Sequence, residues 1–93
     1  MPHSLSAQKR VRQDEKRRLR TRAVRSSMKT YTKKLLSALE AGDADQARTE
    51  YRAASRAIDK AVTRGALHKR TAARQKSRLA ARLSRLAAAT AES

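Results

Sequence analysis

The chain contains no Cys, Trp or Phe, and its single Pro stands at position 2. Without Cys it can form neither disulfides nor thiolate metal sites, zinc fingers included. Only two Tyr remain as aromatic residues, so the chain lacks the stacking platforms of single-strand binders and sequence-reading RNA modules. No apolar run approaches the roughly 18 residues that span a bilayer, and the N-terminus lacks the apolar stretch of a secretory signal. We therefore expect a cytoplasmic protein.

Large aliphatic side chains are also scarce. Leu, Ile and Val total 13 residues, whereas 19 of the 36 apolar residues are Ala. Few large aliphatics together with high net charge are typical of disordered chains. However, Ala, Leu, Arg and Lys are the strongest helix formers. We expect one small helical domain with a thin core, which becomes fully ordered on its partner.

Positive charge is present in large excess and is sorted into two blocks. The net charge is +16 over 93 residues. Residues 9–34 and 64–85 hold 20 of the 24 Lys and Arg against two acidic residues, whereas residues 35–63 carry four basic and five acidic residues. Such a charge repels itself and opposes compaction, so it indicates a polyanionic partner, with nucleic acid as the first candidate.

The only two glycines, Gly42 and Gly65, each follow a helical pattern. Glycine readily adopts the positive φ that ends a helix. We therefore expect three helices joined by short turns. The first is expected over residues 7–41, with Ser6 as its N-cap.

The starts of the other two helices also have local signals. Asp43 followed by Gln46 predicts a capping box for the second helix. The third helix is expected to begin between His68 and Thr71. Each of these two helices should be about 20 residues long, or roughly 30 Å.

Apolar residues fall on one side of each predicted helix at 100° per residue. The three stripes are Val24, Met28, Tyr31, Leu35 and Leu39; Ala44, Ala47, Tyr51, Ala54, Ile58 and Ala61; and Ala72, Leu79, Leu83 and Leu86. Both Tyr lie on these stripes, so core packing is their expected role. The prediction is an all-α fold, an antiparallel three-helix bundle with a long protruding N-terminal helix.

The first helix is too long to be covered by the other two. At 1.5 Å per residue it extends roughly 52 Å, and eight of the 14 residues from Lys9 to Arg22 are basic. We predict a single helical-bundle domain over 1–93, with a terminal tail (1–6), a protruding basic arm (7–22), a bundle (23–88) and a second tail (89–93).

Basic residues at i+3 and i+4 spacing form a row beside the apolar stripe on the first and third helices. The rows are Arg18, Arg22, Arg25, Lys29 and Lys33, and Arg70, Arg74, Arg78, Arg82 and Arg85. A solvated helix face is the alternative, but such faces usually mix signs, and no acidic residue lies between Arg64 and Arg85. In the second helix the row of basic residues alternates with acidic residues, which favours a solvated face there.

Two long segments resemble a known family. They contain SAQKR at 6–10, EKRRL at 15–19 and VRS at 24–26, and then GALHKRTAARQKSRL at 65–79. In this order and spacing they resemble the bacterial small-subunit ribosomal protein S20 family. The resemblance implies a three-helix bundle that binds small-subunit rRNA directly and early in assembly, at the base of the subunit body. It also implies that the long first helix inserts among RNA helices.

The predicted partners are small-subunit rRNA and, peripherally, other small-subunit ribosomal proteins, with no membrane and no small-molecule substrate. His68 could instead be a turn residue, Ser77 could simply face solvent, and Lys76 is expected to extend along the apolar edge of its helix. The predicted rRNA-binding residues are Lys9, Arg10, Arg12, Lys16, Arg17, Arg18, Arg22, Arg25, Lys29, Lys33, His68, Lys69, Arg70, Arg74, Lys76, Ser77, Arg78 and Arg82.

Other function classes have weaker support. Asp14 and Glu15 are adjacent and point about 100° apart on a helix, so local pairing with Arg17 or Arg18 explains them better than catalysis. No nucleophile with a base, Gly-rich loop or metal-ligand spacing is present, so we expect no enzyme, no cofactor and no metal site. Two rivals are a nucleoid protein that binds duplex DNA and a membrane-active amphipathic peptide.

Overall fold

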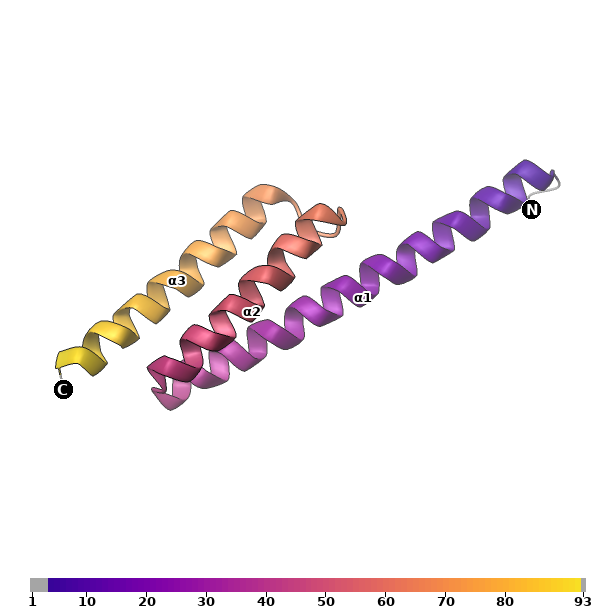
Figure 1. The fold of residues 1–93 in the computed structure, drawn as a ribbon. Coiled ribbons are helices and arrows are strands. Elements are labelled where there is room, and N and C mark those ends of the chain that lie inside the picture. The colour runs from indigo at the N-terminus through magenta and orange to yellow at the C-terminus, as the bar shows by residue number, and fades with distance from the viewer. Residues whose placement is uncertain (1–3, 93) are drawn as a thin grey trace.

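The computed structural model describes residues 4–92, which form three helices: α1 (Leu5–Ala41), α2 (Ala44–Thr63) and α3 (Lys69–Glu92) (Figure 1). No strand occurs within this described range. The chain reverses at both turns, so α2 runs antiparallel to α1 and α3. α2 packs against both neighbours, whereas α1 and α3 contact each other only sparsely. The predicted antiparallel helical bundle with a long first helix is confirmed.

The outer ends of α1 and α3 differ from the expected ones. Ser4, not Ser6, is the N-cap of α1: it has extended backbone, and its side chain accepts the Ala7 N–H at 3.1 Å. The prediction of Ser6 was wrong because two serines fit the capping pattern and only one has the required backbone. α3 continues to Glu92 rather than ending before the tail expected at 89–93, since its last turns are rich in Ala. The remainder of both predicted tails, residues 1–3 and 93, lies outside the described residues.

Both glycines have positive φ, 74° at Gly42 and 75° at Gly65, as predicted. After α1, the Gly42 N–H donates to the Leu39 carbonyl and the Asp43 N–H to the Ala38 carbonyl, both at 3.2 Å. This pair of bonds is a Schellman motif, and the equivalent pair occurs at Gly65. The two motifs satisfy terminal carbonyl groups and set the directions in which the chain leaves α1 and α2.

The capping box predicted for α2 is half formed. The Asp43 side chain accepts the Gln46 N–H at 3.1 Å, so Asp43 is the N-cap as expected. The Gln46 side chain does not return to the Asp43 N–H, which already donates to the preceding helix. It donates instead to Glu50 at 2.8 Å.

The core is thin and rich in alanine. Seven of the ten buried hydrophobic residues are Ala, and only Leu35 and Ile58 are large side chains that are fully buried. The predicted stripe of α2 is buried apart from the half-buried Tyr51, and those of α1 and α3 pack on it. Tyr31 differs from its predicted core role, since it is 36% exposed and has the Lys34 Nζ 5.5 Å from its ring centroid.

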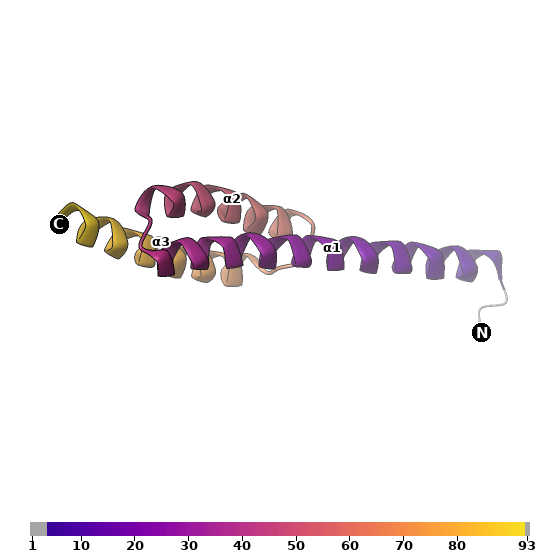
Figure 2. The ribbon, with the colours of Figure 1, turned by 90° about the horizontal axis from the view of Figure 1, so that it is seen from below.

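The molecule is a rod with principal extents of 69 × 21 × 16 Å. α1 accounts for most of the length, because its first half runs past the ends of α2 and α3 (Figure 2). Every residue from 8 to 20 is exposed. The predicted arm is therefore a continuous helix without contacts to the bundle along most of its length.

Candidate nucleic-acid interface

The arm (residues 7–22) carries eight exposed cationic side chains on a bare helix. Only two ion pairs form among the side chains of residues 4–91, and neither involves the arm. The expected pairing of Asp14 or Glu15 with Arg17 or Arg18 is therefore not formed. The unpaired cations are Lys9, Arg10, Arg12, Lys16, Arg17, Arg18, Arg20 and Arg22.

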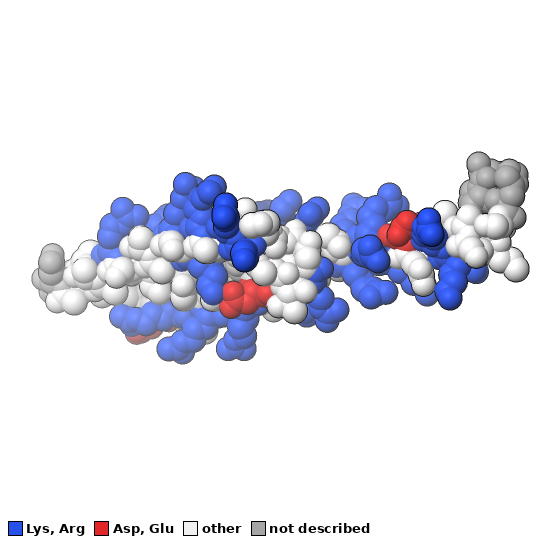
Figure 3. Space-filling model, turned by 90° about the horizontal axis from the view of Figure 1, so that it is seen from above, with Lys and Arg blue, Asp and Glu red and all other residues white. Residues whose placement is uncertain are grey.

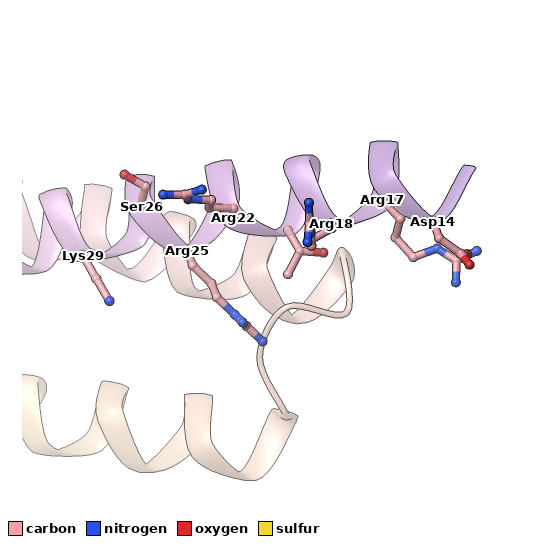
Figure 4. A pocket seen from close by; sticks show the side chains of 8 residues that line it. Asp14, Arg17, Arg18, Arg22, Arg25, Ser26 and Lys29 are labelled. Carbon is pink, nitrogen blue, oxygen red and sulfur yellow. The ribbon is translucent and has the colours of Figure 1, made fainter. Parts of the chain in front are cut away.

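The inner part of the arm and the first turns within the bundle share one open groove of about 700 Å³. We call it the arm groove. Figure 4 shows its side chains, all from α1, with Arg25 reaching toward the turn that precedes α3. It brings together five predicted site residues, and Asp14 is its only carboxylate. The lining residues are Asp14, Arg17, Arg18, Thr21, Arg22, Arg25, Ser26 and Lys29.

Arg25 is held by the bundle. Its Nε–H donates a 3.1 Å hydrogen bond to the carbonyl oxygen of Ala66 in the α2–α3 turn. Ala66 itself is buried. The two terminal nitrogens of the Arg25 guanidinium have no hydrogen bond to any residue in 4–92, so they can still donate to an anion. Arg25 is thus both a positioning residue and a candidate contact.

A second group of cations lies along α3, as predicted. Lys69, Arg70, Arg74, Arg78 and Arg82 are all exposed, and Ser77 is exposed beside them. None of these five cations forms an ion pair with any residue in 4–91. On the face drawn in Figure 3, Lys and Arg extend over both arm and bundle, and acidic residues form only small separate patches. Lys29 and Lys33 extend the α1 row in the same exposed manner.

Two predicted site residues have partners within the protein. The Lys76 Nζ lies 2.9 Å from the Asp59 carboxylate, which ties α3 to α2 and directs Lys76 away from the α3 row. His68 accepts the Arg70 N–H at its Nδ1 at 3.1 Å, so it caps the start of α3. The bond engages Nδ1, so Nε2 is the ring nitrogen left for a contact outside the bundle.

The basic row of α2 is less neutralised than its sequence indicates. Arg48 pairs with Asp45 at 2.8 Å, but Glu50 is engaged with Gln46 and Asp59 with Lys76. As a result, the other three cations of this row have no ion pair with any described residue. They are Arg52, Arg56 and Lys60, all exposed.

Sequence reasoning assigned no contact to Arg20 or Arg64, yet both line one cleft where the arm meets the bundle. The sequence offered one signal for these two residues, the density of positive charge around each of them. The sequence could not give the register of α1 against α2, which brings side chains 44 residues apart to one place.

Within residues 4–91, no group of three or more His, Asp or Glu side chains is arranged to hold a metal ion. No helix in the described part of the chain is long and apolar enough to cross a membrane.

Comparison with known proteins places the chain in a family. The sequence pattern of the family described as "Ribosomal protein S20" matches residues 2–84. The chain is 49% identical over 83 residues to "Small ribosomal subunit protein bS20" of Acidithiobacillus ferrooxidans, covering 89% of this chain and 91% of the relative. The protein of the same name from Thermobifida fusca is 49% identical over 86 residues, 92% of this chain and 94% of the relative.

A third relative covers nearly the whole chain. The Azotobacter vinelandii protein named "Small ribosomal subunit protein bS20" is 45% identical over 91 residues, which is 98% of this chain and 100% of the relative. The matched length includes the arm, both turns and the cationic row of α3. The chain belongs to the ribosomal protein S20 family.

Proposed function

We propose that this chain is a structural component of the bacterial small ribosomal subunit, that it binds small-subunit rRNA directly, and that it helps the RNA to fold during assembly. The observation that carries the proposal is the arm, a bare helix with eight unpaired cations and no contacts to the bundle along most of its length. A helix that is polar all round is seldom stable alone. Phosphates around it would supply the missing partners.

The mechanism is charge neutralisation. Lys and Arg on the arm and on α3 replace counterions condensed on the RNA, and release of those counterions drives binding. Sixteen of the 24 basic residues are Arg, whose planar guanidinium can contact phosphate through two parallel hydrogen bonds. RNA helices that repel one another can then approach on opposite sides of the rod.

The recognition would be of backbone shape rather than base identity. The sequence has no Trp or Phe, and Tyr31, the more exposed of its two Tyr, already has Lys34 near its ring. Phosphate and sugar contacts position a protein on RNA without reading its bases. Specificity for rRNA would therefore come from the folded arrangement of several helices, with other small-subunit proteins as peripheral partners in the cytoplasm.

The test is a competition assay with the full chain. Labelled small-subunit rRNA is bound at fixed salt and displaced by unlabelled rRNA or by duplex DNA with the same number of phosphates. We expect rRNA to displace the probe at far lower concentration. Equal displacement by DNA would refute the proposal and favour a nucleoid protein, while tight binding to anionic lipid vesicles would favour a membrane-active one.

A further inference from the structure

A second cleft, of about 600 Å³, lies where the arm leaves the bundle. Gln13, Lys16, Arg17, Arg20 and Thr21 of α1 form its floor, and Arg64, the residue after α2, forms its wall. We call it the junction cleft. Figure 1 shows the setting: the α2–α3 turn lies beside α1 at the point where α1 continues alone.

The junction cleft concentrates positive charge. Four of its six lining residues are cations, none is acidic, and none of the four cations forms an ion pair within residues 4–91. A cation after α2 gains from the helix dipole. That interaction accounts for Arg64 but not for Arg20 and Lys16 on another helix lining the same space. Like charges from two elements in one concavity repel each other, so the site is suited to an anion.

The junction cleft differs from the arm groove in composition. The arm groove is lined by five cations of α1 and also by the Asp14 carboxylate. The junction cleft holds four cations from two elements and no carboxylate, with the Thr21 hydroxyl and the Gln13 amide as additional donors. Its lining therefore fits several phosphates held close together better than one extended strand.

The shape of the molecular surface at the junction cleft also favours phosphates that lie close together. A strand following the floor of the junction cleft toward the bundle meets the end of α2, whose axis stands about 8–10 Å above that of α1. It cannot continue straight and must turn. Arg64 stands at this step, and Arg17 and Thr21 also line the arm groove, so the two clefts adjoin.

A smaller groove lies between α1 and α2, about one helical turn further along both helices than the junction cleft. It is lined mostly by small side chains, those of Ala23, Ser27 and Ala57, together with Val24. Lys60 is the only charged residue that lines it. Its volume is about 140 Å³. A strand that turns at Arg64 thus finds another unpaired cation along the α1–α2 seam.

We propose that the junction cleft is the seat of a sharp turn in the RNA backbone, where consecutive phosphates crowd together. The inference rests on the proposed rRNA binding; it gives Arg20 of the arm a specific role and adds Arg64 to the contacts. These residues recognise a bent strand, whereas the α1 and α3 rows bind straight ones. Branched RNA should therefore depend on the junction cleft more than linear RNA does.

The experiment compares two charge-matched double variants in the full chain. R20Q/R64Q removes two cations from the junction cleft, and R74Q/R82Q removes two from the α3 row. All four side chains are exposed and form no side-chain hydrogen bond or ion pair within residues 4–91, so both variants should fold. Circular dichroism and thermal unfolding check this. The RNA probes are a three-way junction and a linear duplex with the same number of phosphates.

We expect R20Q/R64Q to weaken binding to the three-way junction roughly tenfold or more, because each Arg–phosphate contact is charge-assisted. Its salt slope on the junction should become shallower by about 2, one for each lost cation. Binding to the linear duplex should change by less than about threefold. R74Q/R82Q should weaken binding to both RNA probes by similar factors.

Two outcomes overturn the inference: no loss on the junction RNA, or equal losses on both probes with R20Q/R64Q. The wild-type chain separates this failure from failure of the proposed function. If it prefers rRNA to DNA while R20Q/R64Q shows no selective loss, only the role of the junction cleft is wrong. If it shows no preference for rRNA, the proposed function itself fails.

Discussion

Arg25 and Ala66 lie 41 residues apart in sequence and are joined by a 3.1 Å hydrogen bond from the Arg25 Nε–H to the Ala66 carbonyl oxygen. This bond ties the α2–α3 turn to α1 at the place where the arm leaves the bundle. α1 and α3 contact each other only sparsely, and α3 is placed relative to α1 mainly through α2, which packs against both. The Arg25–Ala66 bond adds a direct link between α1 and the turn that leads into α3.

Replacing Arg25 with Met should destabilise the fold by about 1 kcal/mol, because the buried Ala66 loses a hydrogen-bond donor to its carbonyl while the aliphatic stem is retained. The matched control is Arg22→Met, one turn away, exposed and without a partner in the described chain. It should change stability by less than about 0.5 kcal/mol. Urea unfolding followed by circular dichroism measures both. Equal effects would show that the Arg25–Ala66 bond contributes nothing.

Leu35→Ala should lower the free energy of unfolding by about 2–5 kcal/mol, because Leu35 is fully buried and its truncation leaves a cavity. Small domains are commonly stable by only about 5–15 kcal/mol, so this loss is a large share of the total. The control is Leu19→Ala on the arm, where Leu19 is 55% exposed. That change should be nearly neutral. Thermal unfolding distinguishes the two, and a large loss with Leu19→Ala would mean that the arm packs on the bundle.

Gly42→Ala should cost about 1–2 kcal/mol, because Gly42 has φ 74° and an L-residue is strained in the left-handed region. A Cβ placed there meets no atom within 4 Å, so steric contact adds nothing. Gly42→Asn should cost less, since Asn tolerates this conformation better. Chemical denaturation of both variants tests the order. A loss with Asn as large as with Ala would point to a cause other than backbone strain.

Deleting residues 1–22 should leave the helicity of the remaining chain largely intact, because residues 8–20 are exposed and make little contact with the bundle. Binding to rRNA should weaken by orders of magnitude, since eight cations are removed. Circular dichroism measures the helicity, and a filter-binding titration measures the affinity for rRNA. Full affinity in the truncated chain would rule out a role for the arm.

The features predicted best from sequence were those set by local chemistry. Gly42 and Gly65 marked the helix ends because almost no other residue adopts positive φ without strain. The exposure of the α1 and α3 rows followed from helical periodicity alone. The resemblance of two segments to a ribosomal protein family was confirmed by the family match. Membership of this family also agrees with the expectation that the chain is not an enzyme.

The features that sequence could not provide depend on how helices pack. Lys76 meets Asp59, and Arg25 meets Ala66, only because α2 and α3 lie at particular registers beside their neighbours. Spacing within one helix carries no information on such contacts. The junction cleft was missed for the same reason, since it depends on where the end of α2 stands above α1. His68 caps α3 only because of the backbone conformation of the α2–α3 turn. The residues next to His68 in the sequence do not determine that conformation.

The dependence of rRNA affinity on salt concentration tests most directly whether the exposed cations replace counterions on RNA. If the full chain neutralises about eight phosphates, log K should fall with log salt at a slope of about −6 to −7. The chain lacking residues 1–22 should have a much shallower slope under the same conditions. A full-chain slope shallower than about −3, or the same slope with and without the arm, would contradict charge neutralisation as the basis of binding.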